Sequence, residues 1–76
     1  MTAENFMIIL DRLRQQQPFR VFTVELLGGE RFQVDHPGAL IARDGVAVFL
    51  APGGAPHWFD HDSALRFIGA ENVVEA

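Results

Sequence analysis

The sequence has no cysteine, no lysine and no long apolar segment among its 76 residues. Without cysteine, neither a disulfide nor a thiolate metal site can stabilise a chain that is short for a domain. No segment approaches the roughly 20 apolar residues that cross a bilayer, and residues 1–5 lack the basic start of a signal peptide, so we expect a cytoplasmic protein without membrane contact. The formal net charge is −4. A general polyanion binder is disfavoured, because phosphate neutralisation needs clustered positive charge.

What the sequence does contain is the composition of a folded protein. Hydrophobic residues make up 49% and charged residues 21% of the chain, which is the opposite of the disorder signature. No repeat, linker or low-complexity segment interrupts residues 1–76, so a single domain is expected. A domain of this size buries a smaller fraction of its surface than a larger domain does. Self-association is the remaining route to stability, and we expect a homo-oligomer.

The N-terminal segment predicts one helix over residues 3–16. Thr2 suits the N-cap position. The apolar residues that follow recur at the spacing of one helical face, at Phe6, Ile9, Leu10 and Leu13. Pro18 ends the helix, because it pushes the preceding residue out of helical geometry. Ile8 falls on the opposite face, where it either contacts a partner or is an ordinary exposed side chain.

From residue 19 the apolar pattern changes to a period of two, which predicts strands through residue 75. A two-residue loop at Gly28-Gly29 would mix polar and apolar residues across the first hairpin. A three-residue loop at 27–29, with Gly29 in a left-handed conformation, matches them instead. The matched pairs are Phe22 with Val34, Thr23 with Gln33, Val24 with Phe32 and Glu25 with Arg31.

Asp44-Gly45 predicts a second hairpin, because this dipeptide suits a two-residue turn. The turn pairs Ile41 with Val48 and Leu40 with Phe49. Residues 46–51 are apolar without alternation, so both faces of this strand should be covered, by the helix, by the barrel interior or by another subunit. The remaining segments are a loop at 52–56, a strand at 57–60, a tight turn at 62–63 and apolar runs at 65–68 and 73–74.

These elements predict a mainly β domain with one N-terminal helix, whose five antiparallel strands close into a small Sm-like or SH3-like barrel. Residues 22–29, FTVELLGG, and the segment Phe59-Asp60-His61 resemble the Sm-like fold of the Sm, LSm and Hfq proteins. The resemblance implies ring assembly and RNA binding. However, Asp60 stands where that family has a phosphate-contacting lysine, Gly28 where it has a turn asparagine, and Val34 where it has a strand-bending glycine. RNA binding is therefore the alternative function.

Residues 18–37 show a closer resemblance to a set of small uncharacterised bacterial proteins with the pattern PFRxFxVxLxxGxxFxVxHP. This second resemblance implies no known activity. It therefore leaves the function to be argued from the residues themselves.

The densest polar cluster, residues 57–62, holds two histidines and two aspartates. On a strand, His57 and His61 would lie about 13 Å apart, too far to share one metal ion. Ser63 beside His61 has no nucleophile elbow or oxyanion loop around it, and Gly53-Gly54 lacks the lysine of a phosphate loop. We therefore expect no enzyme, no metal, no cofactor and no small-molecule substrate.

Three candidate surfaces remain. The favoured function is a non-enzymatic homo-oligomeric scaffold or binding module, whose interface holds apolar residues that one small core cannot hide, namely Ile8, Val46, Val48, Leu50, Val73 and Val74. In the RNA-binding alternative, the phosphate contacts would come from Arg12, Arg14, Arg20 and Arg31. In a further alternative, a monomeric peptide-binding barrel, the ligand surface would hold His57, Trp58, Phe59 and His61.

Overall fold

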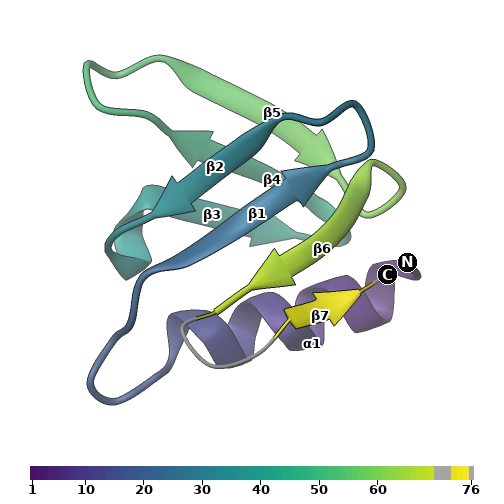
Figure 1. Ribbon diagram of the computed structural model, residues 1–76, viewed down its shortest axis with the longest axis horizontal. Helices are drawn as coiled ribbons and strands as arrows, with labels where there is room; N and C mark the ends of the chain where they lie inside the picture. The colour runs from purple at the N-terminus through teal and green to yellow at the C-terminus, as the bar shows by residue number, and fades with distance from the viewer. Residues whose placement is uncertain (70–72, 76) are drawn as a thin grey trace.

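A computed structural model describes residues 1–69 and the backbone of residues 73–75. The chain is mainly β with one N-terminal helix, as the sequence predicts (Figure 1). The elements in chain order are α1 (Ala3–Arg14), β1 (Phe22–Leu26), β2 (Arg31–Val34), the 3-10 helix η1 (Pro37–Ala39), β3 (Leu40–Arg43), β4 (Val46–Leu50), β5 (Pro56–Asp60), β6 (Ala64–Ile68) and β7 (Val73–Glu75).

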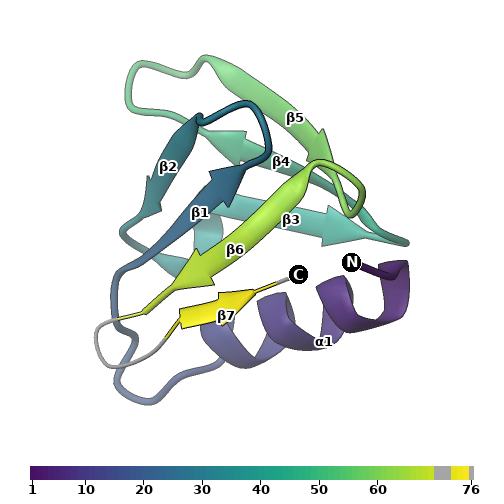
Figure 2. The same ribbon diagram turned by 45° about the vertical axis from the view of Figure 1, so that its right-hand side comes forward.

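The strands form two antiparallel sheets with the orders β2-β1-β6-β7 and β3-β4-β5. Figure 1 shows the two sheets as two layers. Figure 2 shows α1 alongside β7 and β3, which are the edge strands of the two sheets on that side of the molecule. The chain passes between the layers twice, through η1 after β2 and through the turn at residues 61–63 after β5. None of the described helices is long and apolar enough to span a bilayer.

The prediction of five strands closed into a barrel is wrong. Seven strands are described, and no ladder joins the two sheets within residues 1–69 and 73–75. The reason lies in the two connections between the layers. Both turns carry the next strand into the opposite sheet instead of continuing the same one, which leaves β2 and β5 as sheet edges.

The helix begins where the sequence predicts and ends two residues early, at Arg14. The Thr2 side chain caps it, accepting a hydrogen bond from the backbone N–H of Asn5 at 3.1 Å. Phe6 is fully buried. Its ring lies 5.9 Å from that of Phe59 on β5 and 6.0 Å from that of Phe67 on β6. One helical side chain therefore joins both sheets, and the core sits between the sheets and α1.

Both predicted hairpin registers are confirmed. In the first, Val24 pairs with Phe32, and Gly29 adopts a φ of 91° at the end of the three-residue loop. In the second, Asp44 and Gly45 have φ values of 53° and 87°, as a tight two-residue hairpin turn requires. Turn chemistry and cross-strand matching are local, so the sequence alone specifies them.

Within the single chain, only one face of residues 46–51 is covered, and the predicted cover of the other face by another subunit stays a prediction. Along β4 the burial alternates, because successive strand side chains point to opposite faces of a sheet. Ala47 and Phe49 are buried in the core. Val46 and Leu50 are 47% and 41% exposed on the outer side. The single domain thus leaves one apolar face of β4 in contact with solvent.

Candidate functional site

The outer face of the β3-β4-β5 sheet carries a continuous group of apolar side chains. The registers place Ile41, Val48 and Trp58 in one cross-strand row on this face. Ile41 is 56% and Trp58 is 71% exposed. We call this surface the apolar face and define it by Ile41, Val46, Val48, Leu50 and Trp58.

The outer face of the other sheet is polar and internally paired. Glu25, which is only 12% exposed at its side chain, lies between two arginines from the neighbouring strands. One carboxylate oxygen is 3.2 Å from Arg31 Nη2, and the other is 3.2 Å from Arg66 Nε. Thr23 and Gln33 form the next cross-strand pair on this face, and the half-buried Ile68 continues that row on β6. One outer sheet face is thus mainly polar and the other apolar, and the mainly polar face is the better suited to remain in water.

Charges of opposite sign stand at one end of the apolar face. Arg43 on β3 and Asp60 on β5 both pair with Val46, so they share a row on opposite edges of the sheet. The Asp60 carboxylate accepts hydrogen bonds from the backbone N–H of Ser63 at 3.0 Å and from its hydroxyl at 3.1 Å. These bonds lower the pKa of Asp60, the backbone bond most strongly. Asp60 is therefore negatively charged at neutral pH.

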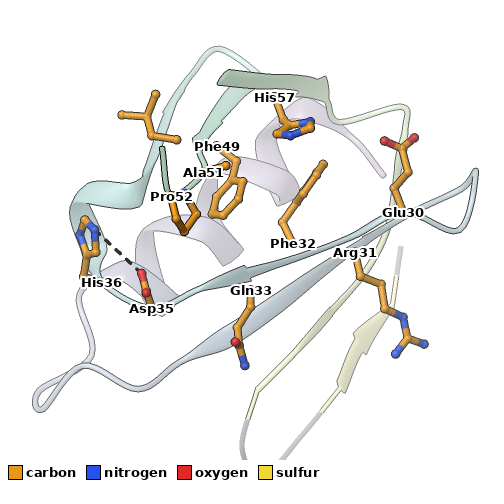
Figure 3. A pocket seen from close by; sticks show the side chains of 11 residues that line it. Glu30, Arg31, Phe32, Gln33, Asp35, His36, Phe49, Ala51, Pro52 and His57 are labelled. Carbon is orange, nitrogen blue, oxygen red and sulfur yellow. Dashed lines mark ion pairs between the residues drawn. The ribbon is translucent and has the colours of Figure 1, made fainter. Parts of the chain in front are cut away.

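A cleft of about 840 Å³ opens between β2 and the β4–β5 hairpin (Figure 3). Its floor is aromatic. The Phe32 ring stacks on Phe49 at 5.2 Å between centroids and lies 5.1 Å from the His57 ring. We call it the β2–β5 cleft, and its lining residues fall within 30–36, 49–52 and 57.

The structure divides the predicted ligand surface between different parts of the molecule. Trp58 belongs to the apolar face, whereas its neighbour Phe59 is buried in the core. His57 lies in the β2–β5 cleft, and His61 contacts Met1 in the turn after β5. The cause is the alternation of side chains along β5. These four residues therefore do not form one surface, and within residues 1–69 no three histidines or carboxylates cluster as metal ligands would.

The predicted interface is brought together in part. Val46, Val48 and Leu50 share the apolar face, whereas Ile8 is 44% exposed on α1. The side chains of Val73 and Val74 lie outside the described residues. Sequence reasoning missed the contributions of Ile41 and Trp58. The register of the second hairpin already pairs Ile41 with Val48, so that signal was available, but the β4–β5 register was not predicted.

The predicted phosphate-contacting arginines come from three segments. Arg12 and Arg14 lie in the last turn of α1, and Arg20 lies in the loop before β1. Arg31 is on β2, and its guanidinium pairs with Glu25 on the outer face of the polar sheet. An ion pair of this kind offsets positive charge that a phosphate contact would need.

No protein-family model, no curated protein and no solved structure matches this chain. The resemblance to Sm-like proteins therefore stays a prediction. The apolar face and the β2–β5 cleft are the two surfaces of the described residues that could bind a partner.

Proposed function

We propose that this protein is a non-enzymatic assembly module that pairs with a second copy of itself through the apolar face. The observation that carries the proposal is the contrast between the two outer sheet faces. The polar sheet satisfies its charges internally through Glu25, whereas the β3-β4-β5 sheet exposes Trp58 and Ile41. Apolar area exposed to water favours association, and contiguous patches of this kind mark interaction sites.

The arrangement of charges selects a second copy as the occupant. Consider two copies whose apolar faces pack against each other, with a two-fold axis that is parallel to β4 and lies midway between the two sheets. This axis places β3 of one copy over β5 of the other. Arg43 then faces Asp60 of the second copy, and the reverse contact forms as well. Ile41 likewise faces Trp58, and Val48, at the centre of β4, faces its own equivalent. This arrangement supports a surface that is self-complementary in charge.

The size of the face sets the expected strength. Three strands of up to five residues cover about 16 Å by 14 Å, from the standard strand rise and spacing. An interface of standard size buries about 800 Å² per partner, which is about one sixth of this protein's surface of 4744 Å². The sheet face, about 220 Å² in projection, lies well below that scale. We therefore expect a weak dimer, with a dissociation constant on the order of 100 μM.

The test uses Val48, because it faces its own equivalent on the two-fold axis. We expect the wild type to convert from monomer to dimer between about 1 and 500 μM in light scattering. Val48→Asp and Val48→Lys should each stay monomeric, since like charges would meet, and an equimolar mixture of the two should form a heterodimer. Thr23→Asp, at the matching position on the polar sheet, is the control and should dimerise normally. A monomeric wild type, or a Val48→Asp protein that dimerises normally, contradicts the proposal.

The same measurement separates the alternatives. The two-fold contact closes on itself, so a ring of the kind that the Sm-like resemblance implies would need a second surface and would give a larger particle. An RNA-binding protein would carry nucleic acid that absorbs near 260 nm and dissociates steeply as salt is raised. A particle larger than a dimer supports the ring, and salt-labile bound nucleic acid supports RNA binding.

A further inference from the structure

We infer that the β2–β5 cleft binds an extended basic peptide, which adds to the free edge of β2 as a further strand. This site goes beyond the proposed self-assembly, because Phe49 and His57 point to the opposite side of the sheet from the apolar face, and Leu50 is the one residue that the two surfaces share. Strand addition needs an open sheet edge, side-chain pockets beside it and charges that match the peptide. The cleft supplies all three.

The first requirement is met by the backbone of β2. Among the described strands, β2 has one neighbour in its sheet, β1. The backbone N–H of Leu26 donates to the carbonyl of Glu30 at 2.8 Å. Hydrogen-bonded and non-bonded pairs alternate along an antiparallel ladder, so Phe32 bonds to β1, whereas the N–H and C=O groups of Arg31 and Gln33 point outward.

This outward edge borders the cleft. Arg31 and Gln33 both line it. Figure 3 shows their side chains directed away from its aromatic floor, toward the other side of β2. The two residues therefore offer their backbone groups to the cleft, at the spacing that an added strand would use.

The second requirement is met by the floor. Phe32, Phe49 and His57 project into the same hollow from three strands (Figure 3). Phe32 and Phe49 are 8% and 7% exposed, so the core holds both rings in place and leaves a small part of each at the cleft, beside the exposed His57. Every second side chain of an added strand would meet these rings. Aliphatic chains and arginine both pack well against aromatic faces.

The third requirement is met by the rim. Glu30 and Asp35 stand at the two ends of β2, with both carboxylates on the cleft side in Figure 3. Arg31 is the one arginine that lines the cleft, and its guanidinium pairs with Glu25 on the far face of the sheet. The Asp35 carboxylate lies 3.9 Å from His36 Nε2, so Glu30 is the rim carboxylate without an ion pair among the described residues. The two carboxylates still make the rim acidic while His36 is neutral, which favours a peptide with basic residues.

The last described strand of this chain does not fill the site. In the sheet order β2-β1-β6-β7, it lies at the opposite edge from β2. The sequence around it, with Glu71 and Glu75, is also acidic. The occupant is therefore a segment of another protein that carries alternating basic and aliphatic residues.

The probe is the capped hexapeptide of alternating arginine and valine, titrated into the isotope-labelled protein and followed by backbone amide NMR. We expect a dissociation constant on the order of 100 μM, with the largest shifts at the amides of Arg31, Gln33 and His57. The matching hexapeptide of glutamate and valine should not bind. A hexapeptide N-methylated on the amides that face β2 should lose about tenfold or more in affinity, because it cannot complete the ladder.

The protein variants test the same edge from the other side. Gln33→Pro removes an N–H that β1 does not use, so the edge strand should persist while peptide affinity falls about tenfold. Gln33→Ala keeps the N–H and should bind as the wild type does. The double variant Glu30→Gln with Asp35→Asn should bind about threefold more weakly.

Several results would overturn the inference. One is no binding of the arginine peptide at about millimolar concentration. Another is binding that N-methylation of the peptide leaves unchanged, which does not depend on how any protein variant folds. A third is equal binding by capped arginine alone, which would indicate a site for one side chain. Shifts centred on Trp58 instead of β2 would place the peptide on the apolar face, and would also contradict the inference.

Discussion

The imidazole of His61 lies with its Nδ1 2.8 Å from the carbonyl oxygen of Met1. Since a carbonyl can only accept, Nδ1 must carry the proton and donate. The bond connects the turn between β5 and β6 to the residue just before the N-cap of α1, 60 positions earlier in the chain. Beside it, the backbone N–H of His61 donates to the carbonyl of Gly45 at 2.8 Å. Helix, hairpin and inter-sheet turn therefore meet at this half-buried histidine.

Replacing His61 with alanine should lower the free energy of unfolding by about 1 kcal/mol, because a part-buried hydrogen bond and its packing are lost. Urea denaturation followed by Trp58 fluorescence measures the change. His57→Ala is the control, because that side chain is exposed in the cleft, and it should cost less. Equal stability of the two variants would show that the contact with Met1 contributes little.

Gly45 should tolerate alanine poorly for two separate reasons. Its φ is 87°, a conformation that side chains disfavour, and an added Cβ would lie 2.8 Å from both Ala3 Cβ and His61 Cδ2. Gly53 has a similar φ of 92°, but an added Cβ there meets nothing within 4 Å. We expect Gly53→Ala to cost about 1 kcal/mol and Gly45→Ala about 3 kcal/mol in the free energy of unfolding.

The comparison of these two glycine variants separates conformation from contact. Denaturant midpoints, converted with a common slope, give both changes. If Gly45→Ala were as mild as Gly53→Ala, the close approach of α1 to the Asp44-Gly45 turn would have no energetic consequence.

Stability should fall in acid in a manner that depends on Ser63. The Ser63 backbone N–H and hydroxyl hold the pKa of Asp60 below its ordinary value of 3.8. A carboxyl whose folded-state pKa is lowered contributes stability that is complete above the unfolded-state pKa and is lost as pH falls through the folded-state pKa. The contribution of Asp60 should therefore begin to decline as pH falls below about 4, and should be lost once the pH is below the folded-state pKa.

The matched variant is Ser63→Ala, which removes the hydroxyl and leaves the backbone bond. We expect a partial rise in the pKa of Asp60 toward its ordinary value, measured by NMR titration of the carboxyl carbon. The drop in stability between about pH 5 and pH 2 should become shallower. An unchanged pKa of Asp60 would mean that the backbone bond acts alone.

Self-association should respond to the charged row at the end of the apolar face. Each dimer contains two contacts between Arg43 of one copy and Asp60 of the other. Arg43→Asp would place like charges at both contacts and should raise the dissociation constant about tenfold at low salt. Added salt should reduce the difference, because these charges are exposed. Arg12→Asp makes the same charge change on α1 and should have little effect. Equal weakening by both variants would indicate a dependence on net charge instead of the Arg43–Asp60 contact.

The two surfaces differ in how much of them the sequence could predict. Val46, Val48 and Leu50 were expected at an interface because apolar residues without alternation exceed what a small core can hold. Which face of β4 is buried depends on which side of the strand the other sheet packs against. That is a property of the tertiary structure. The β2–β5 cleft was not predicted. Its three rings come from three strands, and only folding brings them together.

By itself, the sequence determined the helix, its cap, and both hairpin registers. Those features depend on residues that are close together in the chain. They are the Thr2 hydroxyl, the left-handed conformation of Gly29, and the pairing of apolar with apolar and polar with polar residues across a short turn. Tertiary structure alone decided that η1 and the turn at 61–63 lead into opposite sheets. Nothing local distinguishes a turn that extends a sheet from one that leaves it. In the folded chain, Phe6 packs against rings of both layers, and β2 and the apolar face are left open.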